Sequence, residues 1–216
     1  MLLLLICGDI ESQPGPYRNI PELKTLCSKR GLKICHINIR GLRGKFDEIK
    51  NILSYHKIDI LTLNELFLNK EKVKFEIPGF TFIRKDRKKG TGGGVGMFIR
   101  TELDFKRLNK FEDEEIESIY VKFQPKSSKP FIVGTIYRPP DSSDYLSKKF
   151  ETVLSSRLET LEDINKEIII LGDLNIDYLK KDNETIKDFF RINGFVQLIK
   201  LPTRVTETTS TLIDVI

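Results

Sequence analysis

Histidine and cysteine are scarce in this chain, and that scarcity limits its possible chemistry. Only two of the 216 residues are histidines, so His36 and His56 are the only candidates for imidazole catalysis. The three cysteines, Cys7, Cys27 and Cys35, include no Cys-x-x-Cys pair. This usage argues against a disulfide framework or a zinc site and fits a reducing compartment.

Long apolar runs are also absent. The first seven residues are apolar, whereas a bilayer-spanning helix needs roughly 20. No Lys or Arg precedes the run and no small-x-small cleavage site follows it, so it is a poor secretory signal. The Pro-Gly-Pro turn at residues 14 to 16 then ends any regular element, because proline fixes φ and lacks an N–H. We therefore expect a poorly ordered leader at residues 1 to 30, no secretion and no stable membrane association.

What the chain does contain suits one large globular domain, which we place at residues 31 to 216. Hydrophobic residues make up 39% and charged residues 31% of the sequence, and this length can bury a sizeable core. The net charge of +5 mildly favours a polyanionic partner. The strongest basic patch is RKDRKK, Arg84 to Lys89. It could hold phosphates, or it could be a solvated loop.

Strand-like runs outnumber helical ones, and two of the helical segments cross between strands. This pattern predicts an α/β fold with two packed mixed sheets and helices outside them. The expected helices cover residues 45–55, 143–161 and 184–194. The expected strands lie within residues 32–39, 58–65, 79–84, 94–100, 116–123, 131–137, 167–177 and 210–216.

Polar side chains stand at strand ends where the pattern calls for apolar ones. They are Asn38, Glu65, Asp173, Asn175 and Asp214. A carboxylate next to a buried strand is costly unless it is paired, hydrated or bound to a cation. Asp173 and Asn175 would point the same way in an extended segment. Oxygen ligands without Cys or His suit Mg²⁺ or Mn²⁺, which could polarise a phosphate.

Each of these residues also has a purely structural interpretation. The GDLN stretch around Asp173 could be an Asx-type turn, and Glu65 a hydrated loop acid. Asn38 could cap the following turn, Asp214 could pair with an arginine, and Tyr137 could be a core aromatic. The glycine-rich GTGGGVG lacks the spacing of a phosphate-binding loop, so a tight hairpin before the next strand is favoured.

Seven motifs in order resemble one family, across residues 32 to 216. They are HINIRGL, DILTLNE, GGGVGMFI, GTIYRPP, LGDLNID, LPTRVT and STLIDVI. Together they resemble the endonuclease domain of LINE-type (non-LTR) retrotransposons, in the endonuclease/exonuclease/phosphatase superfamily. The resemblance implies a four-layer α/β/β/α sandwich with a site between the sheets at one end.

The resemblance also implies a role for each matching residue. Glu65 would be the main ligand of Mg²⁺ or Mn²⁺, with Asn38 beside it. Asp173 and Asn175 would orient or deprotonate the attacking water and hold the phosphate. Tyr137 would contact the scissile phosphate, and Asp214 matches an aspartate that pairs with a catalytic histidine. Further substrate contacts would come from Thr203 and Arg138.

The implied reaction is metal-assisted hydrolysis of a DNA phosphodiester. The nick would leave a 3′-hydroxyl that primes reverse transcription of the element's RNA. DNA is therefore the expected partner, with that RNA as a second candidate, in the nucleus or cytoplasm. The alternatives are a catalytically dead remnant that binds nucleic acid, and a hydrolase of small or lipid phosphoesters.

Two departures from the family pattern bear on activity. The family's Ser-Asp-His motif would follow the LID strand, but the chain stops at Ile216. We therefore expect an incomplete domain without its last strands, an Asp214 without its partner, and weak or no activity, because losing such a group typically costs orders of magnitude in rate. The second departure is Phe67, which stands where the family usually has a tryptophan.

The leader carries a second resemblance. GDIESQPGP, residues 8 to 16, looks like a ribosome-skipping (2A-like) peptide with the pattern D-[VI]-E-x-N-P-G-P. Gln13 stands where that pattern has asparagine. We expect weak skipping between Gly15 and Pro16, so that the leader mostly stays attached; a two-reporter translation giving mainly separate products would contradict this.

Overall fold

The structure is a computed structural model of the chain. It describes residues 30–68, 73–88, 90–126, 128–162, 167–180, 184–205 and 208–215. All of the expected leader except Arg30 lies outside the described residues, and so does the 2A-like motif. None of the helices in these ranges is both long and apolar enough to cross a bilayer.

The first half of the described chain builds a four-stranded sheet in the order β1-β2-β4-β3. β1 and β2 are parallel and are joined through helix α2, and the other neighbours are antiparallel. The bounds are β1 Ile34–Asn38, α2 Leu42–Tyr55, β2 Ile60–Asn64, β3 Phe80–Lys85 and β4 Val95–Arg100.

The second half builds a five-stranded sheet in the order β11-β8-β7-β6-β5. Here β7 and β8 are parallel and are joined through α3. The bounds are β5 Phe105–Arg107, η2 Asn109–Phe111, β6 Glu117–Phe123, β7 Phe131–Tyr137, α3 Phe150–Glu162, β8 Glu167–Asp173, α4 Glu184–Ile192 and β11 Asp214–Val215. A separate two-stranded pair joins β9, Arg204–Val205, to β10, Ser210–Thr211.

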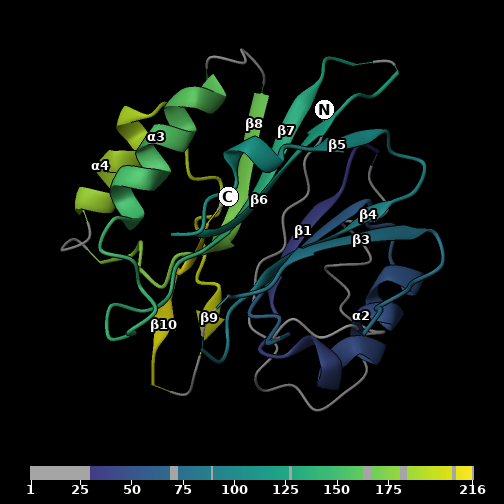
Figure 1. Cartoon of the computed structure of the whole chain (residues 1–216), viewed down its shortest axis with the longest axis horizontal. Coiled ribbons are helices and arrows are strands. Elements are labelled where there is room, and N and C mark those ends of the chain that lie inside the picture. The colour runs from purple at the N-terminus through teal and green to yellow at the C-terminus, as the bar shows by residue number, and fades with distance from the viewer. Residues whose placement is uncertain are drawn as a thin grey trace.

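Three hydrophobic clusters stack these elements into four layers. The central cluster fills the space between the two sheets and includes Met97, Ile99, Val121 and Val133. A second cluster packs α2 on the outer face of the first sheet, and a third packs α3 and α4 on the outer face of the second. Figure 1 shows this order, with α3 and α4 on one side and α2 on the other. The predicted α/β/β/α sandwich is confirmed.

The helices form where apolar residues recur at helical spacing. In α2 the buried side chains are Leu42, Ile49, Ile52 and Leu53, which share one face. α3 begins only at Phe150, later than the predicted 143, because residues 141–149 form turns. α4 ends at Ile192, just before Gly194 at a φ of 73°, a left-handed conformation that glycine favours at helix ends.

Two sequence predictions about strands need correction. STLIDVI is not one strand: Ser210–Thr211 pairs with β9, whereas Asp214–Val215 pairs with β8 in the large sheet. The chain turns between them, where the N–H groups of Ile213 and Asp214 both donate to the Thr203 hydroxyl. The glycine-rich stretch does join two antiparallel strands, β3 and β4, but through a longer loop than the predicted tight turn.

Candidate active site

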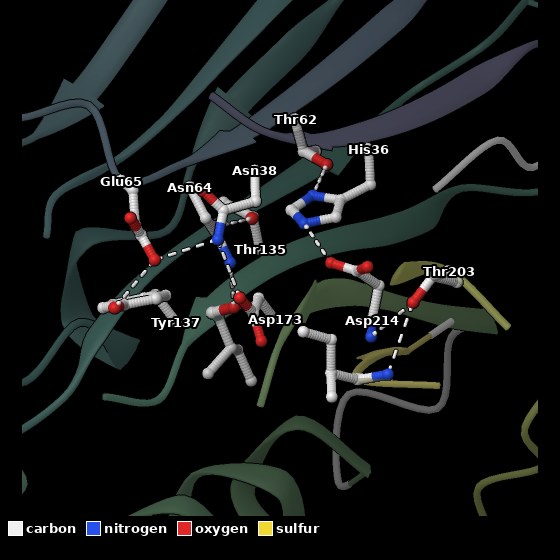
Figure 2. A network of polar contacts seen from close by, with 12 residues as sticks. His36, Asn38, Thr62, Asn64, Glu65, Thr135, Tyr137, Asp173, Thr203 and Asp214 are labelled. Carbon is white, nitrogen blue, oxygen red and sulfur yellow. Dashed lines mark hydrogen bonds and ion pairs between the residues drawn. The ribbon is translucent and has the colours of Figure 1, made fainter. Parts of the chain in front are cut away.

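The ends of four strands bring polar side chains together between the two sheets (Figure 2). Asn38 ends β1 and Asn64 ends the parallel strand β2, where the two residues are register partners. In the other sheet Tyr137 ends β7 and pairs in register with Asp173, which ends β8. Because parallel strands end at the same edge of a sheet, both sheets present their polar ends at one place.

A hydrogen-bond network connects three of the predicted site residues to Asn38. The Asn38 amide donates to Glu65 Oε1 over 2.9 Å and to Asp173 Oδ2 over 2.7 Å. The Tyr137 hydroxyl donates to the same Glu65 oxygen over 3.1 Å. Side chains that are separated by 27, 72 and 135 positions in the sequence thus meet in one cluster. The sequence pattern indicated each residue separately, and the fold brings them together.

Burial changes the ionisation of two groups in this network. Burial, followed by the negative charges of Glu65 and Asp173, raises the pKa of Tyr137. Its hydroxyl therefore stays protonated and remains a donor. Burial and the Asp214 carboxylate raise the pKa of Asp173 well above its usual value, against the opposing hydrogen bonds from Asn175 and Asn38. The cluster holds more negative charge than its surroundings solvate, a setting that favours a cation.

Asn175 lies beside Asp173 but does not point the same way. β8 ends at Asp173, and Asn175 has a φ of 51°, so the segment is not extended as predicted. The Asn175 N–H donates to Asp173 Oδ1 over 2.7 Å, which is an Asx turn. The Asn175 amide donates to the Arg138 carbonyl over 2.9 Å. The turn interpretation is therefore correct, and the turn also holds the Asp173 carboxylate in place.

Arg138 is directed away from the network. Its guanidinium donates to Asp141 over 2.6 Å and lies 5.7 Å from the centre of the Phe150 ring at the start of α3. The Arg138 N–H donates to the Asp173 carbonyl over 2.9 Å, so the backbone of Arg138 helps to hold the end of β8. Its predicted contact with substrate stays a prediction.

Asp214 has a partner, contrary to expectation. Its carboxylate Oδ1 lies 3.6 Å from Nε2 of His36, and both side chains are fully buried. The other ring nitrogen of His36 lies 2.9 Å from the Thr62 hydroxyl. That hydroxyl donates to the Cys35 carbonyl, so it accepts from His36. The pair joins β1 to β11 across the two sheets (Figure 2) and commits the His36 imidazole to Asp214.

Thr203 lies next to this pair and supports it. Its hydroxyl accepts the N–H groups of Ile213 and Asp214, at 3.3 and 3.2 Å. These two bonds fix the turn that carries Asp214 into the large sheet. The predicted contact of Thr203 with a phosphate stays a prediction.

The described members of the basic patch are engaged in contacts within the protein. Arg87 donates to Glu117 over 2.6 Å, and its guanidinium lies 4.6 Å from the centre of the Tyr145 ring and 5.8 Å from that of Tyr137. A Cβ at Gly93 would collide with this guanidinium. Lys88 pairs with Glu114. The patch therefore anchors the glycine-rich loop against the second sheet.

Sequence reasoning missed the backbone conformations at the site. Among the described residues, four that are not glycine have a positive φ: Arg40, Glu65, Phe67 and Asn175. All four follow the strand ends that form the site. Such conformations cost roughly 1–3 kcal/mol each and concentrate at functional sites. No local sequence signal reports them, because left-handed Arg, Glu and Phe are uncommon.

Asn64 was also missed, although it locks the two sheets together. Its amide donates to the Ile136 carbonyl over 2.8 Å, and its oxygen accepts from the Thr135 hydroxyl over 3.2 Å. Asn64 is fully buried at the end of β2. A polar residue closing an otherwise apolar strand was the available signal.

Comparison with known proteins identifies the family. The model of the endonuclease/exonuclease/phosphatase family matches residues 35–212, most of the chain. The chain belongs to this family. Members are hydrolases of phosphate esters that typically use a divalent metal ion, and the sequence resemblance to the superfamily is thereby confirmed. No protein of curated function matches the chain.

Solved structures of this family share the fold at low sequence identity. The endonuclease domain of TRAS1, a telomere-specific non-LTR retrotransposon, is 14% identical with a TM-score of 0.60, over 84% of this chain and 82% of that one. The mannosyl-6-phosphatase of Bacteroides thetaiotaomicron is 17% identical with a TM-score of 0.59, over 86% and 84%. The catalytic domain of human Nocturnin is 16% identical with a TM-score of 0.53, over 80% and 73%. These likenesses show the fold and leave the substrate open.

The residues at the site fit a divalent metal ion. Among the described residues, no three His, Cys, Asp or Glu side chains converge as a metal cluster. Asn38 Oδ1, however, is buried and accepts no hydrogen bond from any described residue. With the Glu65 carboxylate hydrogen-bonded to the same side chain, it forms an oxygen-only pair of the kind that Mg²⁺ accepts alongside water and phosphate.

Proposed function

We propose that the chain is a Mg²⁺-dependent DNA endonuclease of the non-LTR retrotransposon type. It would hydrolyse a phosphodiester and nick target DNA, which then primes reverse transcription of the element's RNA. The observation that carries this proposal is the buried network of Asn38, Glu65, Tyr137 and Asp173 at the strand ends. The fold shared with the TRAS1 endonuclease domain and the net charge of +5 support DNA as the substrate.

Each residue of the network has a role that its geometry supports. Glu65 and Asn38 would hold the metal ion, which supplies positive charge to the phosphate and the leaving oxygen. Tyr137 keeps its proton and can donate it in a hydrogen bond to a phosphate oxygen. Asp173 is held by the Asn38 amide and the Asn175 N–H, so one carboxylate geometry is available to orient the attacking water.

One observation favours a second function, a nucleic-acid-binding protein with little catalysis. Both histidines of the chain are buried, and His36 is committed to Asp214. The His36 imidazole is therefore engaged with Asp214 and does not support charge on the phosphate. We expect slow nicking for this reason, with the four-residue network providing what catalysis there is.

Nicking of supercoiled plasmid by the purified protein tests the proposal. With Mg²⁺ we expect slow, metal-dependent conversion to the open circle, and a loss of at least about 100-fold in Glu65→Ala. The matched control is Glu114→Ala, which removes an exposed carboxylate that pairs with Lys88 and should leave the rate unchanged. Salt-dependent DNA binding should persist in both variants, because it depends on cations.

Three outcomes would argue against this proposal. Binding without metal-dependent nicking in the folded wild-type protein would identify the binding protein instead. Hydrolysis of a small phosphate ester, with neither binding nor nicking of DNA, would indicate a phosphatase of the same family. Equal nicking by wild type and Glu65→Ala would mean that the activity does not come from this site.

A further inference from the structure

Phe67 is exposed at the edge of the candidate site, two residues after Glu65. All fourteen phenylalanines of the chain lie in the described residues, and Phe67 alone among them is exposed, with 42% of its surface accessible. Its neighbours Leu66 and Leu68 are buried. The segment therefore has ample apolar anchors without this ring, so its exposure needs another explanation.

The backbone holds Phe67 firmly in this exposed position. The Phe67 N–H donates to the Gly93 carbonyl over 2.9 Å, and the Leu66 N–H donates to that of Gly94 over 3.2 Å. On the opposite side the carbonyls of Glu65 and Leu66 accept the N–H groups of residues 41 and 42. Phe67 itself has a φ of 54°, an unfavourable conformation for a bulky residue. The ring is thus held in an exposed position although its backbone conformation is strained.

Two glycines lie against the ring. A Cβ at Gly41 would come within 3.6 Å of the ring, and one at Gly92 within 3.5 Å. Both glycines have a positive φ, at 103° and 79°. The ring therefore lies between two segments of bare backbone, one before α2 and one in the glycine-rich loop. Because the ring still has 42% of its surface accessible, it offers area for stacking.

The charges around the ring suit a nucleic acid. The Arg40 side chain is 32% exposed and lies 4.0 Å from Glu65. Arg43 is exposed in the first turn of α2, next to Leu42, whose N–H donates to the Leu66 carbonyl. A nucleotide stacked on Phe67 would have cations near its phosphates, which supply the sequence-independent part of binding.

The distance between Glu65 and Phe67 also fits the spacing of nucleotides in one strand. Residues two apart lie within about 7 Å of each other between Cα atoms, and nucleotides in one strand rise about 3.4 Å each. A phosphate at Glu65 and Asn38 would therefore leave a base one or two nucleotides away within reach of Phe67. We propose that Phe67 stacks on a nucleobase beside the scissile phosphate. This proposal rests on the proposed function and adds a substrate-positioning residue to it.

Binding to a single-stranded oligonucleotide containing 2-aminopurine tests this without relying on catalysis. Stacking of an aromatic ring quenches the fluorescence of this base. Phe67→Ala should bind about 5- to 100-fold more weakly and lose the quenching, since one stacked base contributes about that much. Phe67→Leu should behave like Phe67→Ala, because it keeps an apolar side chain without a ring, whereas Phe67→Trp should restore both signals.

The matched control is Tyr55→Ala. Tyr55 is also an exposed aromatic, 57% accessible, at the other end of α2, about 20 Å along the helix axis. The Tyr55→Ala variant should bind the oligonucleotide like wild type. The dependence of binding on salt should have the same slope in every variant, since no charge is changed. If Phe67→Ala does not fold, Phe67→Leu and Phe67→Trp carry the comparison.

Three results would overturn the inference, and they are distinguishable. Equal binding and quenching in wild type, Phe67→Ala and Phe67→Leu would remove Phe67 from DNA binding while leaving the endonuclease proposal intact. No binding by the wild-type protein, either to this oligonucleotide or to the supercoiled plasmid, would overturn the proposed function itself. A wild-type dimer in light scattering that dissociates in Phe67→Ala would show that the ring contacts a second copy instead.

Discussion

The buried pair of His36 and Asp214 makes a strong prediction about stability. Neither oxygen of the Asp214 carboxylate has a hydrogen-bond partner among the described residues, so its main compensation is the imidazole 3.6 Å away. His36→Leu removes that partner and leaves an unpaired carboxylate in the apolar space between the sheets. Leucine is similar in size to histidine, so cavity formation contributes little.

The expected loss is large relative to the total stability. Removing one partner of a buried pair costs about 3–5 kcal/mol, against a total of about 5–15 kcal/mol for a typical domain. For a domain of this size the melting temperature should fall by about 6–20 °C. The double variant His36→Leu with Asp214→Val should recover most of the loss, because an apolar pair replaces the buried polar one.

Urea denaturation of the two single variants and the double variant measures this coupling directly. His56→Leu is the control: it removes another buried imidazole, at the end of α2, and should cost about 1–2 kcal/mol. If His36→Leu costs no more than His56→Leu, or if the single losses add up in the double variant, the two side chains do not stabilise each other and the reasoning is wrong.

Three further predictions concern other contacts. Asn64→Ala should cost about 2–3 kcal/mol, because it removes both hydrogen bonds that lock the sheets, whereas Thr135→Val removes one and should cost about 1 kcal/mol; equal losses in urea denaturation would contradict this. Gly93→Ala should lower the melting temperature more than Gly79→Ala, since both have a positive φ but only the first would collide with a guanidinium. The Glu115 N–H, then Arg157, lower the pKa of Asp113 below its usual 3.8. The charged Asp113 carboxylate therefore stabilises the fold above pH 3.8, and this stabilisation is lost as the pH falls through the lowered pKa. Asp113→Asn should cost up to about 1 kcal/mol at pH 7 and nothing once the pH is below both the usual and the lowered pKa. A loss of stability that does not change with pH would rule out this carboxylate as its source.

The sequence predicted the two packed sheets and their polar strand ends for a local reason. A buried strand that ends in a polar side chain is visible in a few residues, and Asn38, Glu65 and Asp173 each follow such a strand. The family resemblance implied that these ends meet between the sheets. The individual hydrogen bonds could not be predicted, because they depend on the register of strands far apart in the chain.

Contacts between distant segments could not be predicted in the same way. His36 and Asp214 stand near opposite ends of the described chain, and only the packing of β1 against β8 and β11 brings them together. The division of STLIDVI between two sheets depends on the Thr203 hydroxyl, which no period in the sequence reveals. Arg87 in the basic patch was expected to face solvent or phosphate, yet Glu117 and two aromatic rings enclose it.

The left-handed residues at the strand ends lower the stability of the fold at positions with proposed roles in its chemistry. Arg40, Glu65 and Phe67 each hold a backbone conformation that glycine would adopt with less strain. A selection for thermal stability alone would therefore be drawn to glycine at these positions. Each such step would remove the carboxylate proposed to bind metal, a cation or the ring proposed to stack, so directed evolution of a more stable variant needs a simultaneous selection for the proposed DNA nicking.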